Sequence, residues 1–142
     1  MENIKTSKTQ NILWLFMGLV LVVAGIGHLT FARIEFQAQV PDWVPIDKDL
    51  TVVLSGIVEI ILGLTICIVK RYRTYTGIFT AVFFVMVFPG NMAQYLNARD
   101  GFGLDTDALR IMRLFFQPVL IFWALWSSGA WEYLHRLNTN NH

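Results

Sequence analysis

Four long apolar segments constrain this 142-residue chain more than any other feature. They cover residues 12–31, 51–69, 76–96 and 114–131, and each is close to the roughly 20 residues that a helix needs to cross about 30 Å of hydrocarbon. Charged residues make up only 15% of the sequence, against about 25% in a soluble domain. We therefore predict an all-α fold, a polytopic membrane four-helix bundle.

The apolar segments define one domain over residues 12–131, preceded by an N-terminal segment, 1–11, and followed by a tail, 132–142. The first run is longer than the apolar part of a signal peptide, which has about 7–15 residues, so we predict that it is retained as a helix. The third run contains Pro89, where we expect a kink, because neighbouring helices can satisfy the backbone groups that a proline frees.

Lysine and arginine positions predict the orientation, because they are enriched in cytoplasmic loops. The count on the two sides is nearly even, six against five, but Lys70, Arg71 and Arg73 crowd into one short turn. We place this turn and both termini in the cytoplasm, as in a multi-pass protein of the cell membrane. Loops 31–49 and 98–107 then lie outside. The first should form a short interfacial helix closed by Pro41, Trp43 and Pro45, as a membrane anchor or as a lid over the bundle.

Polar side chains within the apolar segments are the candidate functional residues, because such groups are costly in lipid and face the bundle interior. At about 1.5 Å per residue, His28, Asn91 and Gln117 lie ~5–7 Å below the outer boundary and Glu59 lies ~13 Å below it. Four helices thus contribute polar groups to the outer half, which predicts a pocket there. Asn91 and Gln117 are also typical of structural links between helices, and Arg113 is long enough to reach the interface.

Glu59 is the strongest functional candidate, because a carboxylate near the membrane centre must be paired, hydrated or protonated. We predict that Glu59 and His28 are catalytic. The predicted ligand-binding residues are Asn91, Gln94, Arg113, Gln117 and Trp43.

Small residues indicate close helix contacts. Gly18 and Gly25 share a stripe with His28, and either Ser55 or Gly56 shares one with Glu59 and Gly63. Leu19 and Ile66 are expected to face lipid. Cys67 is the single cysteine, so neither a disulfide nor a paired-cysteine redox or metal site is predicted, and a net charge of +1 suggests no nucleic-acid partner.

Five short motifs occur in a fixed order: Gly25-x-x-His28, Val40-Pro41-x-Trp43-x-Pro45, Ser55-Gly56-x-x-Glu59, Pro89-Gly90-Asn91 and Arg113-x-x-x-Gln117. Together they resemble the DoxX family of small four-helix bacterial membrane proteins, over about residues 12–131. The resemblance implies that the shared polar set is His28, Glu59, Asn91, Arg113 and Gln117. Gly90 stands where alanine is expected.

The DoxX resemblance implies a subunit or accessory of a quinone-linked redox or oxidative-stress system, with a quinone as ligand and a redox partner subunit. No motif in the sequence identifies a cofactor. Two alternatives stay open. The first is a lipid-modifying enzyme, such as an isomerase, that uses Glu59 and His28 as acid and base. The second is a non-catalytic membrane protein that binds a partner or assists assembly, and the partner could be another copy of the chain. Whether the chain is an enzyme therefore stays undecided.

The orientation yields a direct test. In a variant that lacks Cys67 and carries Asp47→Cys, the new thiol should react with a membrane-impermeant reagent in intact cells. Labelling that requires cell lysis would reverse the assigned orientation.

Overall fold

The computed structural model describes residues 4–141, which form six helices and no strand. The helices are α1 (Lys8–Leu29), α2 (Arg33–Gln37), α3 (Lys48–Ile68), α4 (Arg73–Leu96), α5 (Asp107–Ser128) and α6 (Ala130–Asn140). Within this part of the chain α1, α3, α4 and α5 are long and apolar enough to cross a membrane. The predicted all-α membrane bundle with a short helix between the first two spans is confirmed.

Capping residues set the helix ends, and they lie several residues away from the ends of the apolar segments. Ser7 and Gln10 form a reciprocal capping box at the start of α1, and the side chain of Thr106 accepts a hydrogen bond from the Leu109 N–H at the start of α5. Such caps satisfy backbone N–H groups that have no partner within the helix. Gly129 adopts a left-handed conformation (φ 80°) and ends α5, so the chain turns there into α6.

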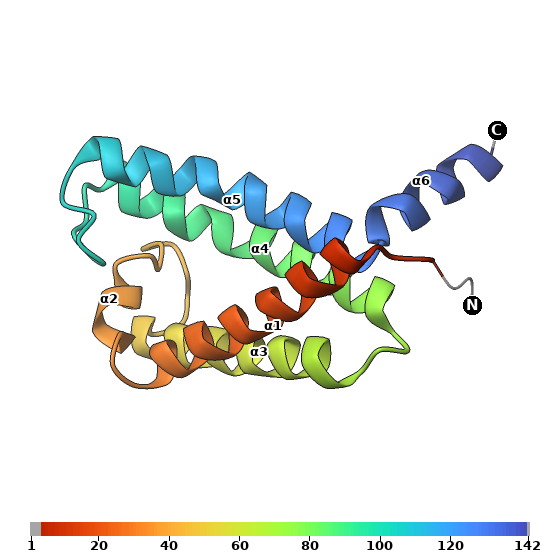
Figure 1. The fold of residues 1–142 in the computed structure, drawn as a ribbon. Helices are drawn as coiled ribbons and strands as arrows, with labels where there is room; N and C mark the ends of the chain where they lie inside the picture. The colour runs from red at the N-terminus through yellow and green to blue at the C-terminus, as the bar shows by residue number, and fades with distance from the viewer. Residues whose placement is uncertain (1–3, 142) are drawn as a thin grey trace.

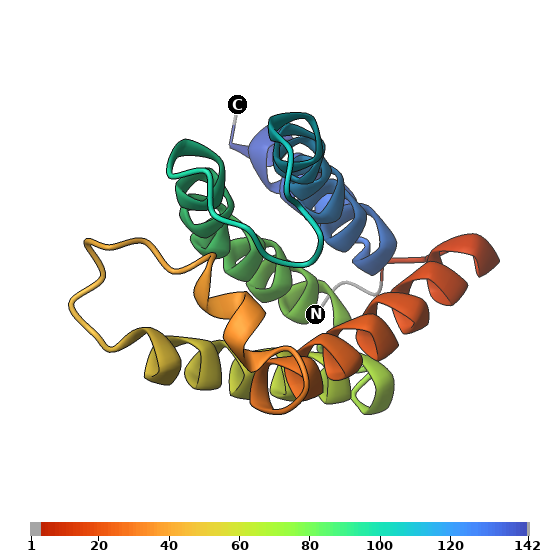
Figure 2. The ribbon, with the colours of Figure 1, turned by 90° about the vertical axis from the view of Figure 1, so that its left-hand side faces the viewer.

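The membrane helices are arranged as two pairs (Figure 1). α1 packs along α3 and α4 packs along α5, whereas α3 and α4 make few contacts. The pairs meet at the end of the bundle next to α6, and at the other end, the α2 end, α2 and the long loops lie between them (Figures 1 and 2). The looser contact between the pairs leaves room for a site at the α2 end.

Glycines allow the close packing of α1 against α3. A Cβ atom on Gly25 would lie 2.6 Å from the carbonyl oxygen of Gly56, and one on Gly63 would lie 2.6 Å from that of Gly18. Only residues without a side chain fit at this separation. The predicted glycine stripes are therefore confirmed.

The outer surface of the long helices carries large apolar side chains, among them Phe79 and Phe115. Lipid solvates such a surface, so the protein is a multi-pass membrane protein. Leu19 is 53% exposed, as expected for a lipid-facing residue, but the same expectation was wrong for Ile66, which is 3% exposed. Ile66 is buried because it packs beside Gly18, where the absence of a side chain leaves space for it.

Arg73 joins the two pairs at the end of the bundle next to α6. Its guanidinium donates to the carbonyl of Ser127 in α5 and to the side chain of Asn11 in α1, and it lies 5.6 Å from the centre of the Trp14 ring. Because Arg73 begins α4, one side chain ties α4 to both neighbouring helices.

The glycine contacts predict which substitutions the bundle resists. Gly25→Leu and Gly63→Leu should each destabilise the protein by about 1–3 kcal/mol, because a bulky side chain forces α1 and α3 apart. Thermal unfolding in detergent measures this loss. Leu19→Phe, on the lipid-facing side of α1, is the control and should change stability little. Equal tolerance of all three variants would contradict the assigned contact.

Candidate functional site: a polar cavity between the helix pairs

A cavity of about 190 Å³ lies at the α2 end of the bundle. Each of the four long helices contributes a polar side chain to its wall: His28 from α1, Glu59 from α3, Asn91 from α4, and Arg113 and Gln117 from α5. The rest of the lining includes apolar residues such as Val52, Phe84 and Leu120. Five polar residues singled out in the sequence therefore meet around one space.

Gln117 is the centre of the polar network, and its side chain is fully buried. Its Nε2 donates to the carbonyl oxygen of Phe84, 2.7 Å away. The Oε1 of Gln117 accepts from Asn91 Nδ2 at 3.1 Å and from Arg113 Nη1 at 2.9 Å.

The partners of Gln117 fix the orientation of Asn91. A backbone carbonyl can only accept and a guanidinium can only donate, so Gln117 must point Nε2 at Phe84 and Oε1 at Arg113. Asn91 must then turn its own NH₂ group towards Gln117. This leaves Asn91 Oδ1 buried without a hydrogen-bond donor among residues 4–141, on a residue that is 3% exposed.

His28 and Glu59 form the second polar pair. His28 Nδ1 lies 2.9 Å from the carbonyl oxygen of Ala24 and 2.9 Å from Glu59 Oε2. Because both neighbours are acceptors, Nδ1 carries a hydrogen. The hydrogen is aligned with Ala24, one turn earlier in α1, and Glu59 Oε2 has no aligned donor in the described chain. The two side chains are therefore in close contact without an aligned hydrogen bond between them.

Two residues that line the cavity thus each carry a buried acceptor, Glu59 Oε2 and Asn91 Oδ1, that lacks a donor within residues 4–141. Buried polar atoms are rarely left unpaired, because desolvation without a partner costs about 1–3 kcal/mol per group. Arg113 faces the same space and attracts the Glu59 carboxylate. The chemical complement of this site is a small group with hydrogen-bond donors, such as a pair of hydroxyls.

Phe36 in α2 covers the His28 side of the cavity, and sequence reasoning did not single it out. Its ring stacks on the His28 ring with centroids 3.3 Å apart and an angle of 15° between the planes. Phe102 packs edge-on against Phe36 at 4.6 Å, and the Phe102 N–H donates to Glu35 in α2. An aromatic residue in a short amphipathic segment resembles a membrane anchor, so the sequence contained no signal that separated the two roles.

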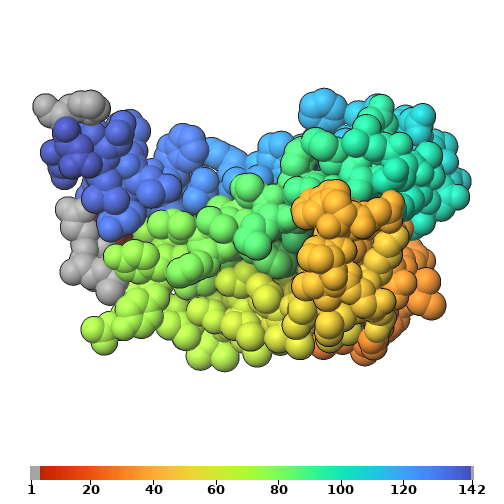
Figure 3. All heavy atoms as spheres, turned by 180° about the vertical axis from the view of Figure 1, so that it is seen from behind, coloured from red at the N-terminus to blue at the C-terminus, as the bar shows by residue number. Residues whose placement is uncertain are grey.

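The segment 38–47, called the mouth segment below, lies beside α4 (Figure 3) and covers the mouth of the cavity. Arg99 holds it by donating to the carbonyl of Val40 at 2.7 Å and to Asp42 at 2.5 Å. Lys48 also binds Asp42, at 2.8 Å. Hydrogen bonds from Lys48, and to a lesser extent from Arg99, lower the pKa of the Asp42 carboxyl below its ordinary value. The carboxyl therefore stays ionised at neutral pH, and these contacts persist.

Trp43 lies at this mouth, where it lines the cavity and remains 74% exposed. It is therefore placed to touch a molecule in the cavity opening. The same exposed position suits an interfacial anchor, and both interpretations of Trp43 stay open.

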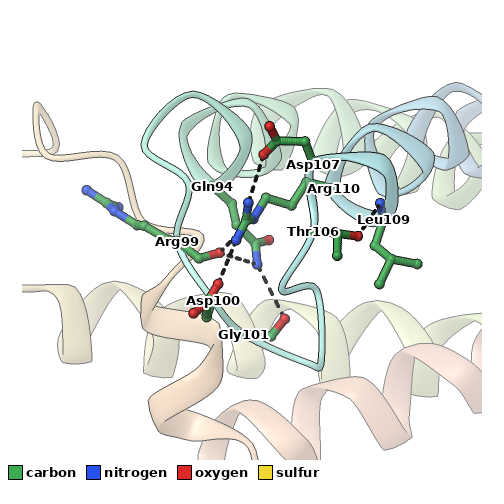
Figure 4. A network of polar contacts seen from close by, with 8 residues as sticks. All are labelled: Gln94, Arg99, Asp100, Gly101, Thr106, Asp107, Leu109 and Arg110. Carbon is green, nitrogen blue, oxygen red and sulfur yellow. Dashed lines mark hydrogen bonds and ion pairs between the residues drawn. The ribbon is translucent and has the colours of Figure 1, made fainter.

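Gln94 was predicted to bind a ligand, but it does not line the cavity. Its side chain is buried elsewhere. Its Nε2 donates to the carbonyls of Arg99 and Gly101, and it accepts from Gln39. Figure 4 shows it inside the loop after α4, next to the Arg110 guanidinium, which pairs with Asp100 and Asp107. Gln94 and Arg110 therefore shape the loop that anchors the mouth segment.

This fold and site define a polytopic four-helix membrane protein with a polar cavity between its helix pairs. The sequence profile of one family, described as a domain of unknown function (DUF8561), matches residues 17–128. The chain therefore belongs to the DUF8561 family, and the matched region includes all the polar residues of the cavity. No curated protein and no solved structure matches the sequence.

The role of Gln117 can be tested by removing its amide. Gln117→Leu should destabilise the protein by about 1–3 kcal/mol or more, because the Asn91 amide and the Arg113 guanidinium each lose a buried partner. Thermal unfolding in detergent provides the measurement, with Phe115→Leu on the lipid-facing side of α5 as the control. Unfolding temperatures that match in the two variants would show that the network contributes little to stability.

Proposed function

We propose that the protein binds the reduced head group of a membrane quinone in this cavity and acts as an accessory subunit of a quinone-linked redox system. The observation that carries the proposal is the pair of buried acceptors, Glu59 Oε2 and Asn91 Oδ1, without donors among residues 4–141. A quinol has two hydroxyl donors, whereas the oxidised quinone has only acceptors. The unpaired oxygens therefore favour the reduced form.

The size and position of the cavity also support a ring-shaped membrane ligand. A cavity of about 150 Å³ holds a benzene ring, and this one has about 190 Å³. Glu59 lies 11 residues into α3, about 16 Å from its start at ~1.5 Å per residue. A ligand that reaches Glu59 from the membrane needs no passage through water. We place this end of the bundle on the outer side, with both termini cytoplasmic.

In this proposal a partner subunit takes the two electrons when the quinol is oxidised. The proton of the hydroxyl bound by Glu59 passes to the Glu59–His28 pair, and the second proton passes to water at the cavity mouth. Glu59 is suited to accept this proton, because its Oε2 has no aligned donor among residues 4–141, and His28 Nδ1 lies 2.9 Å from it. The predicted resemblance of the cavity motifs to those of DoxX proteins also supports the proposed redox role.

The same His28–Glu59 contact favours one second candidate, a lipid-modifying enzyme that uses the two groups as acid and base. Such an enzyme would convert its lipid when supplied without a partner subunit. The two functions therefore separate when the purified protein is incubated with extracted membrane lipids and the products are analysed by mass spectrometry.

The test compares two substitutions of Glu59. Wild-type protein extracted from its membranes should retain ubiquinone or menaquinone, measured by mass spectrometry. Glu59→Gln keeps the shape of the side chain but removes its charge, so retention should fall about tenfold, the equivalent of about 1.4 kcal/mol, at an unchanged unfolding temperature.

Glu59→Leu distinguishes binding from a structural role. If the role of Glu59 is to bind a ligand, the leucine variant should remain stable, because burying an apolar side chain inside a membrane protein carries no desolvation cost. A strongly destabilised Glu59→Leu variant, together with normal quinone retention in Glu59→Gln, would contradict the proposal. Glu59 would then have a role in helix packing instead.

A further inference from the structure

A second, apolar groove runs along the surface between α3 and α4. It has a volume of about 510 Å³ and is lined from α3 by residues such as Leu54, Val58 and Leu62, and from α4 by Phe79 and Val82. The groove lies where the two helix pairs make few contacts, and most of its wall is hydrocarbon. Figure 3 shows α3 and α4 on this face, with the mouth segment at one end.

The groove and the polar cavity adjoin each other. Thr51 and Ser55 of α3 and Met86 and Val87 of α4 line both spaces. A molecule could therefore extend from the buried acceptors, between these four residues, into the groove without leaving the protein surface. Met86 is a suitable boundary residue, because its unbranched side chain adapts to different shapes.

The dimensions of the groove match a lipid-like chain. From Thr51 to Leu62 the groove follows 11 residues of α3, about 16 Å at a rise of ~1.5 Å per residue. This length is about half of a ~30 Å hydrocarbon core. It runs from the α2 end of the bundle towards the membrane centre, the direction in which the tail of a membrane amphiphile points.

We propose that the α3–α4 groove holds the apolar tail of the molecule whose head group lies in the cavity, and that the gap between Ser55 and Met86 is the lateral entrance from the bilayer. This inference rests on the proposed function, since it assigns the tail site and the route of the same ligand. The ligand class is thereby narrowed to amphiphiles with one long tail and a hydroxyl-bearing ring.

The test uses two probes that share a ring, menaquinol with its prenyl tail and menadiol without it, titrated anaerobically onto the purified protein in detergent. Menaquinol should bind about tenfold or more tightly than menadiol, because tail burial adds apolar contact area. Val82→Trp fills the groove and should abolish this advantage, leaving menadiol affinity unchanged. Ubiquinol and its tail-free ring form a second pair for the same comparison.

Val85→Trp is the matched control. Val85 lies on α4 near Val82 with a similar exposed fraction, 54% against 49%, but lines neither the groove nor the cavity. It should bind menaquinol like the wild type. Unfolding temperatures of both tryptophan variants verify that each is folded.

The outcomes separate the two proposals. If neither ring binds in either pair, the proposed function fails. If tailed and tail-free probes bind with equal affinity and Val82→Trp behaves like Val85→Trp, the head-group site stands and the tail site is wrong. Loss of co-purified phospholipid in Val82→Trp at unchanged menaquinol affinity would also overturn the inference, because the groove would then hold bulk lipid.

Discussion

Polar groups inside hydrocarbon must form their hydrogen bonds within the protein. In this bundle the Gln117 side chain is the hydrogen-bond partner of three neighbouring groups. It donates to the Phe84 carbonyl and accepts from Asn91 and Arg113. These contacts join α4 to α5, and they determine which atom of the Asn91 amide remains unpaired. The orientation of Asn91, and hence which of its atoms lacks a donor among residues 4–141, follows from this one amide.

The unequal packing of the helices explains where the cavity forms. Glycines let the backbones of α1 and α3 approach closely, while α3 and α4 make few contacts. One tight pair and one looser interface leave space between the pairs, and the mouth segment covers it through Arg99. The same loose interface opens to lipid along α3 and α4. A site that is polar at one end and apolar at the other is thus a consequence of the packing.

Membership of the DUF8561 family rests on a match over residues 17–128. The resemblance to DoxX proteins rests on the order of five short motifs, and it stays a prediction. The geometry of the cavity adds an argument that is independent of either family. Two buried oxygens that lack donors among residues 4–141 support the proposed donor-bearing ligand whatever the ancestry of the chain.

The sequence by itself determined the number of spans and the inward polar set, because hydrophobic length and the cost of burying charge act along each helix separately. The glycine contacts could also be predicted, since small residues have few other reasons to form a stripe. Only the tertiary structure decided that Ile66 is buried, that Gln94 lies outside the cavity, and that Phe36 stacks on His28. Each of these depends on which helix or loop lies opposite, and hydrophobicity along a single segment carries no information about its neighbour.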